Sequence, residues 1–336
     1  MARVAVVGGG AWGSVFAVVA RDAGNDVTVW VRRDEQAREI NAGANERYCP
    51  GLDMSAVTAT TSLPQALAHA AIVVVAVPSN AVRETMNEAA GHVRADATIV
   101  SLVKGVEAST LMLMTDVIAE ATNVDPGRVV ACSGPNLSAE IARRKPTGTL
   151  VAGKDAERAA WVAARIHTGY FRPYVATDVV GVEVGGVVKN IVAMAVGASA
   201  GMDLGVNARA YIINRGLMEM ARLGIALGAN AETFLGLAGL GDLVATSSSP
   251  LSRNYSFGYR LGQGMSVTEA LAASAGTVEG ARSCPHVLAL AARHGVAMPI
   301  SEAAQAVIDG RMGIEEAALG VFRAPRVTDG VEARMV

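Results

Sequence analysis

The chain contains very little cysteine, since Cys49, Cys132 and Cys284 are its three cysteines in 336 residues. Three is an odd number and the positions are widely spaced, so the pattern is neither that of a disulfide framework nor that of a zinc-binding cluster. The sequence therefore predicts a protein of a reducing compartment, which we expect to be the cytoplasm, and it predicts no bound metal.

Long apolar runs are missing too. The longest uninterrupted run, residues 70–77, is far shorter than the roughly 20 residues that a helix needs to cross a bilayer. The chain begins with Arg3 and an apolar stretch, as a secretory signal does, but three consecutive glycines and Trp12 interrupt that stretch. We therefore expect a strand at this place, and no membrane span.

Neither sign of charge dominates, because 29 Lys and Arg residues stand against 31 Asp and Glu, for a formal charge of −2. Runs of basic residues and alternating basic and aromatic residues are both absent, so nucleic acids and anionic membranes are not expected as partners. A hydrophobic content of 51% and a length typical of about two domains indicate a globular chain with sizeable cores.

Glycine, by contrast, is abundant, and its first cluster carries the strongest signal. The apolar run 3–7 leads directly into Gly8-x-Gly10-x-x-Gly13, and a helix-like stretch and a second strand at 27–31 follow. In a dinucleotide-binding βαβ unit, the first glycine makes the tight turn, the second lets the backbone approach a pyrophosphate, and the third lets the helix pack on the strand. The helix N-terminus then faces the phosphates. The alternative is an ordinary glycine-rich turn of a parallel sheet.

The end of the second strand predicts which dinucleotide binds. An acidic residue there would select NAD by binding the ribose 2′-hydroxyl, but the sequence has Arg32 and Arg33. Two guanidinium groups suit a 2′-phosphate, so NADP(H) should bind at least as well as NAD(H). Asp34 and Glu35 keep NAD(H) possible, and a solvated basic helix start is the structural alternative.

Strands and helices alternate through the first half of the chain. Further strand-like runs, with helix-like stretches between most of them, lie at 72–77, 98–103, 128–132, 149–152 and 171–176. Alternation of this kind is typical of a doubly wound, mostly parallel α/β sheet. We therefore predict a Rossmann-like dinucleotide-binding domain at residues 1–180.

From Val179 onward the chain is nearly all helix-compatible. Asp178 can cap a long helix that reaches Gly201, and its internal glycines indicate close helix packing; further helices are expected at 207–227 and 267–273. The sequence therefore predicts an all-α domain at residues 181–336 for substrate binding and catalysis.

Two lysines stand where chemistry is expected. Lys104 ends the strand-like run at 98–103, at the carboxyl edge where ligands of such sheets bind. Lys189 lies in an apolar, glycine-rich helix, where burial lowers the pKa of a lysine, as a proton donor to a developing alkoxide requires. The alternatives are a solvated strand-end lysine and a lysine that reaches out to water.

Further candidate site residues are polar side chains at 242–254. Asp242 and Thr246 are four apart at the start of a predicted helix, so both project from one face, where the carboxylate could orient Lys189. A helix N-cap is the structural alternative for Asp242. The tripeptide Ser252-Arg253-Asn254, in a serine-rich turn, combines a hydroxyl, a guanidinium and an amide, which suits a phosphate dianion.

Together these motifs resemble the bacterial NAD(P)-dependent glycerol-3-phosphate dehydrogenases, almost from end to end. The resemblance implies a dimeric enzyme with a helical second domain, which transfers hydride from NADPH or NADH to C2 of dihydroxyacetone phosphate. The product is sn-glycerol 3-phosphate, which supplies phospholipid synthesis. The segments that carry the resemblance are Gly8-Gly-Gly-Ala-Trp-Gly13, Ser133-Gly-Pro-Asn136, Glu183-Val-Gly-Gly-Val-Val-Lys-Asn190, Gly236-Leu-Ala-Gly-Leu-Gly-Asp-Leu-Val-Ala-Thr246, Leu251-Ser-Arg-Asn254 and Val278-Glu-Gly280.

The resemblance also implies roles for single residues. Lys189 would be the general acid and base, and the catalytic group would also hold Asp242, Lys104 and Thr246. The substrate would be bound by Lys104, Gly134, Asn136, Lys189, Asp242, Ser252, Arg253 and Asn254. The cofactor would be bound by Gly8, Gly10, Ala11, Trp12, Gly13, Arg32, Arg33, Lys104, Ser138, Arg253, Thr277 and Glu279.

Two other functions stay open at this point. A related two-domain NADP-dependent reductase of a 3-hydroxy acid or a ketopantoate-like substrate has the same architecture and needs no phosphate clasp. A non-catalytic NADP-binding sensor would have no use for Lys104, Lys189 and Asp242.

Overall fold

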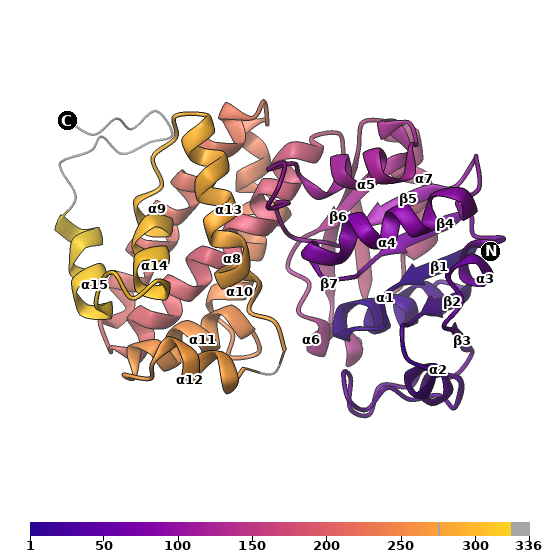
Figure 1. Cartoon of the computed structure of the whole chain (residues 1–336), viewed down its shortest axis with the longest axis horizontal. Helices are drawn as coiled ribbons and strands as arrows, with labels where there is room; N and C mark the ends of the chain where they lie inside the picture. Colours follow the sequence, from indigo (N-terminus) through magenta and orange to yellow (C-terminus); the bar gives the residue numbers. More distant parts are fainter. Residues whose placement is uncertain (275, 324–336) are drawn as a thin grey trace. The chain divides into compact units, whose positions relative to one another are not determined.

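The computed structural model describes residues 1–274 and 276–323. The chain forms two compact units, one made of Met1–Glu107 and Met112–Val179, the other of Ala108–Leu111 and the chain from Val180 on (Figure 1). Residues 324–336, which the predicted helical domain includes, lie outside the described residues.

The first unit is built on one sheet of eight strands in the order β3-β2-β1-β4-β5-β6-β7-β8. Neighbouring strands are parallel except β6 and β7, which are antiparallel, so the predicted mostly parallel, doubly wound sheet is confirmed. The strands are β1 (Arg3–Val7), β2 (Asp26–Trp30), β3 (Val57–Thr60), β4 (Ile72–Val75), β5 (Thr98–Ser101), β6 (Val129–Ser133), β7 (Thr147–Gly153) and β8 (Phe171–Ala176).

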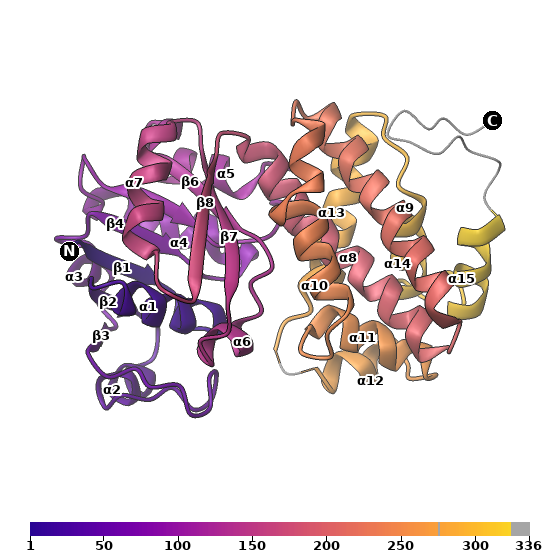
Figure 2. The same ribbon diagram turned by 180° about the vertical axis from the view of Figure 1, so that it is seen from behind.

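Helices cover both faces of this sheet, as Figures 1 and 2 show from opposite sides. In β1, Val4 and Val6 belong to one apolar core and Ala5 and Val7 to the other, so a strand buried on both faces reads as a continuous apolar run. The helices of this unit are α1 (Ala11–Asp22), α2 (Asp34–Asn41), α3 (Leu63–Leu67), α4 (Val82–Ala89), α5 (Met114–Thr122), α6 (Ser138–Ala142) and α7 (Ala156–Ile166).

In the part that the structure describes, the regular elements of the second unit are all helices. A single π-helical turn, η5 (Leu237–Gly241), runs directly into α10. The helices are α8 (Val179–Gly201), α9 (Gly205–Ala226), α10 (Asp242–Ser247), α11 (Arg253–Gly262), α12 (Val267–Ala272), α13 (Glu279–Arg293), α14 (Pro299–Ile308) and α15 (Ile314–Arg323).

Helix α8 is the core of this unit. By length and composition it could cross a membrane, but 89% of its most apolar window is buried inside the protein. The glycines that would weaken an exposed helix have a packing role here, because a Cβ at Gly197 would overlap the carbonyl of Tyr255, and a Cβ at Gly258 would overlap that of Met194. The close packing predicted for the glycines of α8 is confirmed at Gly197, where α8 and α11 cross in backbone contact.

Candidate active site

The glycine loop between β1 and α1 has the geometry that the motif predicts. Gly8 has a φ of +119°, and a Cβ there would lie 2.9 Å from the carbonyl of Ala76, just beyond β4. At Gly13 a Cβ would overlap the carbonyl of Gly8, whereas nothing lies within 4 Å of one at Gly10. The loop is therefore tight at two of its glycines and open at the one where a pyrophosphate has to approach.

Helix α1 begins directly after this open position. No side chain caps its first N–H groups, so they are available to an anion together with the positive end of the helix dipole. Ala11 and Trp12 are half-buried in the first turn, and the Trp12 ring packs edge-on against Phe16, with ring centroids 5.7 Å apart. These features fit the phosphates of a dinucleotide.

Arg32 and Arg33 lie between β2 and α2 and are both exposed. Among the described residues no carboxylate forms an ion pair with either guanidinium. The Asp34 carboxylate is already engaged, because Thr61 Oγ1 donates to its Oδ1 at 2.8 Å. Two unpaired guanidinium groups at this place suit a 2′-phosphate better than a free 2′-hydroxyl.

Lys104 approaches the loop that follows β6. It lies three residues beyond the end of β5 at Ser101, so the expectation that it ends the strand is wrong. Its half-buried side chain donates a hydrogen bond from Nζ to the Gly134 carbonyl at 3.4 Å. Gly134 has a φ of +151°, and a Cβ there would lie 3.1 Å from Thr149 Cα. A side chain at Gly134 would therefore disturb this loop.

The same loop holds buried polar atoms that have no partner. Asn136 donates from Nδ2 to Thr149 Oγ1 at 2.9 Å, but its Oδ1 and the hydroxyl of Ser133 are buried without a hydrogen bond. Buried polar groups are nearly always satisfied, so these two atoms are candidates for ligand contacts. Ser133 was not among the predicted site residues, because a serine at the end of a buried strand has no signal of its own. Ser138, a predicted cofactor contact, is half-buried at the start of α6.

In the helical unit, Lys189, Asp242 and Thr246 form a closed cluster. Lys189 Nζ lies 2.9 Å from Asp242 Oδ1 and donates to Thr246 Oγ1 at 2.6 Å, and the Thr246 hydroxyl donates to Asp242 Oδ1 at 3.0 Å. Their exposed fractions are 6%, 1% and 2%. The prediction that Asp242 orients Lys189 is thus matched by a direct contact. The N-cap alternative is wrong, because Gly241 holds the N-cap position of α10.

The cluster follows from the packing of α8 against η5. A Cβ at Gly185 would overlap the carbonyl of Ala238, so only a glycine lets the two backbones meet there. Lys189 lies one turn further along α8 on the same face, and Asp242 comes directly after η5. The close approach at Gly185 therefore brings the ammonium and the carboxylate together.

The predicted serine-rich turn at 252–254 is instead the start of a helix. Ser252 caps α11 by accepting the N–H of Tyr255 at 3.2 Å, so the exposed Arg253 and the buried Asn254 lie in the first helical turn. Serine is a preferred N-cap residue, which explains why a helix begins here instead of a turn. The hydroxyl, guanidinium and amide still come from adjacent residues at a helix N-terminus, where an anion is favoured.

Asn254 has an internal role that the sequence did not reveal. Its Nδ2 donates to Asn190 Oδ1 at 2.8 Å, and its Oδ1 accepts the N–H of Gly280 at 2.8 Å. Asn190 follows Lys189 on α8, and Gly280 lies in the first turn of α13. Asn254 therefore links α8, α11 and α13, and one of its amide hydrogens is left for a ligand.

Arg253 lies near the segment that leads into α13. A Cβ at Gly276 would lie 3.0 Å from its Nη1. Burial raises the pKa of the Glu279 carboxyl, and the positive charges of Arg282 and Arg253 partly oppose this increase. Glu279 Oε2 is buried without a hydrogen-bond partner. Thr277, which lies between Gly276 and Glu279 in the sequence, is half-buried. Three of the predicted ligand residues, Arg253, Thr277 and Glu279, thus belong to one region of the helical unit.

Within the described residues, no three His, Cys, Asp or Glu side chains gather as metal ligands would. The three cysteines are free and buried, and burial raises the pKa of Cys49 and Cys132 to about 11 and that of Cys284 to about 12. Thiols of this kind are inert at neutral pH. The cysteines therefore offer no nucleophile at neutral pH.

Both units match models of one protein family. The N-terminus of NAD-dependent glycerol-3-phosphate dehydrogenase matches residues 3–159, and the C-terminus of the same family matches residues 178–319. These two matches cover most of the chain.

Named relatives are similar over nearly the whole chain. The glycerol-3-phosphate dehydrogenase (NAD(P)+) of Streptomyces griseus is 49% identical over 308 residues, which cover 91% of this chain and 92% of that protein. The Corynebacterium glutamicum enzyme of the same name is 49% identical over 319 residues, 94% of this chain and 96% of that protein. The crystal structure of glycerol-3-phosphate dehydrogenase from Coxiella burnetii superposes with a TM-score of 0.90 at 34% identity, over 96% of this chain and 99% of that one.

Proposed function

Since the chain belongs to the NAD-dependent glycerol-3-phosphate dehydrogenase family, we propose that it reduces dihydroxyacetone phosphate to sn-glycerol 3-phosphate, reversibly, with NADPH or NADH. The product supplies the backbone of glycerophospholipids. The observation that carries the proposal is the buried cluster of Lys189, Asp242 and Thr246, which holds a proton donor in a single position.

Lys189 is the proton donor in this reaction. A nicotinamide cofactor, when bound, supplies the hydride that C2 receives. As the C2=O double bond becomes single, the Lys189 ammonium gives a proton to the oxygen and is left as a neutral amine. In the reverse direction the neutral amine accepts the hydroxyl proton.

Asp242 and Thr246 position this nitrogen. The contacts of 2.9 Å and 2.6 Å hold Nζ through two neighbouring oxygens, and the Thr246 hydroxyl, which donates to Asp242, can only accept from Lys189. A donor held in this way does not have to be ordered when the substrate binds.

The sheet unit supplies most of the cofactor contacts. The loop of Gly8, Gly10 and Gly13 and the N-terminus of α1 bind the pyrophosphate, and Arg32 and Arg33 bind the 2′-phosphate of NADP(H). NAD(H) uses the same loop without the arginine contacts. The further cofactor contacts that we assign are Ala11, Trp12, Lys104 and Ser138, and in the helical unit Arg253, Thr277 and Glu279.

For the substrate, Arg253 binds the phosphate through its exposed guanidinium, with Ser252 and the remaining amide hydrogen of Asn254. From the sheet unit we assign Lys104, Gly134 and Asn136 to the substrate, supported by the unpartnered Asn136 Oδ1. We further propose that the two compact units are the two functional domains and that the enzyme works as a homodimer in the cytoplasm. Sedimentation equilibrium tests the dimer, and a mass of one chain at micromolar concentration contradicts it.

The test is a pair of spectrophotometric assays on the purified protein. Oxidation of NADPH and of NADH is followed in parallel with dihydroxyacetone phosphate and with unphosphorylated dihydroxyacetone. We expect rapid turnover with the phosphorylated ketone alone. Equal rates with both ketones, or turnover of ketopantoate instead, contradict the proposal, and tight binding of NADPH without turnover of any phosphorylated ketose favours a sensor.

A further inference from the structure

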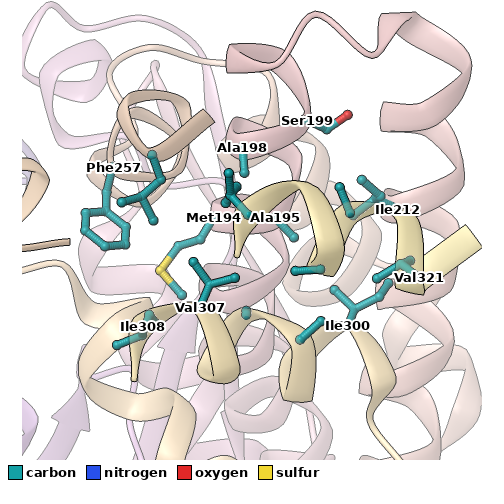
Figure 3. A pocket seen from close by; sticks show the side chains of 16 residues that line it. Met194, Ala195, Ala198, Ser199, Ile212, Phe257, Ile300, Val307, Ile308 and Val321 are labelled. Atoms are coloured by element: carbon teal, nitrogen blue, oxygen red, sulfur yellow. The ribbon is translucent and has the colours of Figure 1, made fainter. Parts of the chain in front are cut away.

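The helical unit contains an apolar pocket of about 60 Å³ between α8, α9, α11, α14 and α15 (Figure 3). Its lining includes Met194, Phe257, Ile300 and Val307, and none of its side chains carries a charge. A binding site fixes the orientation of its ligand through a few convergent polar groups. Apolar walls of this kind therefore indicate no particular ligand.

In the sheet unit, three buried polar side chains converge on a single backbone oxygen, that of Gly9. Gln36 Nε2 donates to it at 2.6 Å, Asn45 Nδ2 at 3.1 Å and Ser14 Oγ at 3.3 Å. These side chains belong to residues that are 7%, 0% and 0% exposed. A backbone carbonyl has two lone pairs, so this one is surrounded by more donors than it has lone pairs.

The three donors also bond to one another. Asn45 Nδ2 donates to Ser14 Oγ at 2.8 Å, and Gln36 Nε2 donates to Asn45 Oδ1 in a long hydrogen bond of 3.5 Å. Gln36 lies in the first turn of α2, and Asn45 lies in the loop that follows this helix. Two of the donors therefore reach the Gly9 carbonyl from outside the glycine loop and the helix that it leads into.

Gly9 is the one glycine of the triplet 8–10 that the dinucleotide-binding pattern does not require. A Cβ at this place would lie 2.5 Å from Val31 Cγ1 and 2.9 Å from Gln36 Nε2. The missing side chain therefore leaves the room in which the Gln36 amide reaches the carbonyl.

The bonds to the Gly9 oxygen also fix the N–H of Gly10. Both groups belong to one peptide, and this peptide is trans, so the C=O and the N–H point in opposite directions. The Gly10 N–H therefore points away from the buried donors. Gly10 is also the open position of the loop, where no atom of the described residues lies within 4 Å of a Cβ.

We propose that Gln36 and Asn45 are positioning residues of the cofactor site, which hold the Gly9–Gly10 peptide so that its N–H donates to the pyrophosphate. A peptide between two glycines rotates easily, because neither residue has a Cβ to restrict it. Rotation by half a turn would turn the partial negative charge of the Gly9 oxygen toward the phosphates. The donors prevent this rotation before the cofactor arrives, so binding does not have to order the peptide. The proposal rests on the assignment of the pyrophosphate to this loop under the proposed function.

This role differs from that of Arg32 and Arg33, although Gln36 lies three residues beyond Arg33. The arginines bind a phosphate that only NADPH carries, whereas the Gly10 N–H meets a pyrophosphate that NADPH and NADH share. The apolar side chains of Ala37 and Ile40 anchor α2 in the core, so α2 stays in place without the Gln36 bond. Loss of that bond should therefore leave the arginine contacts intact.

Fluorescence titration of Gln36→Met with NADPH and with NADH tests the role without any measurement of activity. Methionine has nearly the size of glutamine and cannot donate to the Gly9 carbonyl. We expect both affinities to fall by the same factor, about ten-fold, which is the effect of one hydrogen bond to a charged group. Asn45→Ala should show the same pattern, and Ser14→Ala, which removes the longest of the three bonds, should show a smaller equal loss.

Gln305→Met is the matched control, because Gln305 on α14 is 9% exposed and donates from Nε2 to Asp309 Oδ1 at 2.7 Å. The same substitution of a buried, hydrogen-bonded glutamine should leave both cofactor affinities as they are. A loss in Gln305→Met as large as that in Gln36→Met would show a general effect of buried glutamines and overturn the proposal.

The remaining outcomes are equally decisive. Unchanged affinities in folded Gln36→Met or Asn45→Ala overturn the role of that residue, and Ser14→Ala decides in the same way if neither variant folds. A larger loss for NADPH than for NADH would show that Gln36 acts through the arginines, which also overturns the proposal. Cofactor binding with the expected variant effects, in a protein that reduces no phosphorylated ketone, would refute the proposed function and leave the positioning role in place.

Discussion

Lys189 Nζ and Asp242 Oδ1 are 2.9 Å apart in the interior of the helical unit, on side chains that are 6% and 1% exposed. A buried ion pair seldom adds stability over apolar residues of the same size, because both charges lose their hydration. The proposed function accounts for this ion pair in the middle of an apolar helix, since a ketone reduction needs a proton donor in a fixed place.

Lys189→Ala is expected to lower kcat by roughly two to four orders of magnitude, the usual size of a general-acid contribution. The variant also removes the ammonium beside the buried Asp242 carboxylate, which costs about 3–5 kcal/mol of stability. Steady-state kinetics with dihydroxyacetone phosphate and thermal unfolding measure the two effects.

The double variant Lys189→Ala with Asp242→Asn is the control, because it also removes the buried negative charge. It should regain much of the stability and none of the activity, and NADPH binding should stay intact in both variants. Turnover near that of the original enzyme in either variant sinks the acid–base assignment.

Arg32→Ala combined with Arg33→Ala is expected to weaken NADPH binding at least ten-fold and to leave NADH binding nearly unchanged, because only NADPH carries the 2′-phosphate. Fluorescence titration of both cofactors measures the difference. Arg38→Ala, on the exposed side of α2, is the matched control and should leave both affinities as they are. An equal loss for the two cofactors would show that the arginines do not contact the 2′-phosphate.

The sequence predicted those parts of the site that depend on local patterns. The glycine loop is a local pattern, because Gly8, Gly10 and Gly13 lie within six residues and each meets a different steric requirement of the loop. Lys189 stood out as a cation in an apolar helix, and Asp242 and Thr246 by their spacing. The residues predicted that the Asp242 carboxylate could orient Lys189, and the resemblance placed Thr246 in the same catalytic group.

Other parts depend on contacts between distant residues and gave no local signal. The bond from Asn254 to Asn190 exists because α8 and α11 cross in backbone contact, which neither helix reveals alone. Strand β3 was missed because the Thr residues in Val57–Thr60 give it little apolar character, and its pairing with β2 stabilises it. The apolar pocket arises where five helices meet, and its lining residues are ordinary core residues in the sequence.

Stability of the helical unit is expected to depend on pH through Glu219. This carboxylate on α9 accepts the N–H groups of Ile300 and Ser301 at the start of α14, and burial nevertheless raises its pKa from 4.5 to about 7. The folded protein therefore holds a proton that the unfolded chain releases between these two values. Stability from this group is complete below pH 4.5 and is lost as the pH rises to 7, by about 3 kcal/mol in all.

Glu219→Gln removes this titration. Thermal unfolding of both proteins at pH 5 and pH 8 measures the effect, and the loss of stability between the two pH values should be smaller in the variant. The difference between the two proteins isolates Glu219 from other titrating groups. A loss of the same size in both proteins would assign the pH dependence to other residues.

Gly258→Ala is expected to destabilise the protein by several kcal/mol, because the added methyl group overlaps the carbonyl of Met194 and forces α8 and α11 apart. Gly320→Ala is the matched control on α15, where no atom of the described residues lies within 4 Å of a Cβ. It should raise stability by up to about 1 kcal/mol, the helix propensity gained. Similar unfolding temperatures for the two variants would contradict the close crossing of the helices.

The most direct test of the central claim compares dihydroxyacetone phosphate with dihydroxyacetone as substrates of the original enzyme and of Arg253→Ala. If Arg253 binds the phosphate of a phosphorylated ketone that Lys189 protonates, the original enzyme strongly prefers the phosphorylated substrate. Arg253→Ala should then lose most of that preference, because KM rises far more for dihydroxyacetone phosphate than for dihydroxyacetone; any effect through the cofactor contact of Arg253 is common to both substrates. An unaltered preference in Arg253→Ala, or no preference in the original enzyme, would contradict the account.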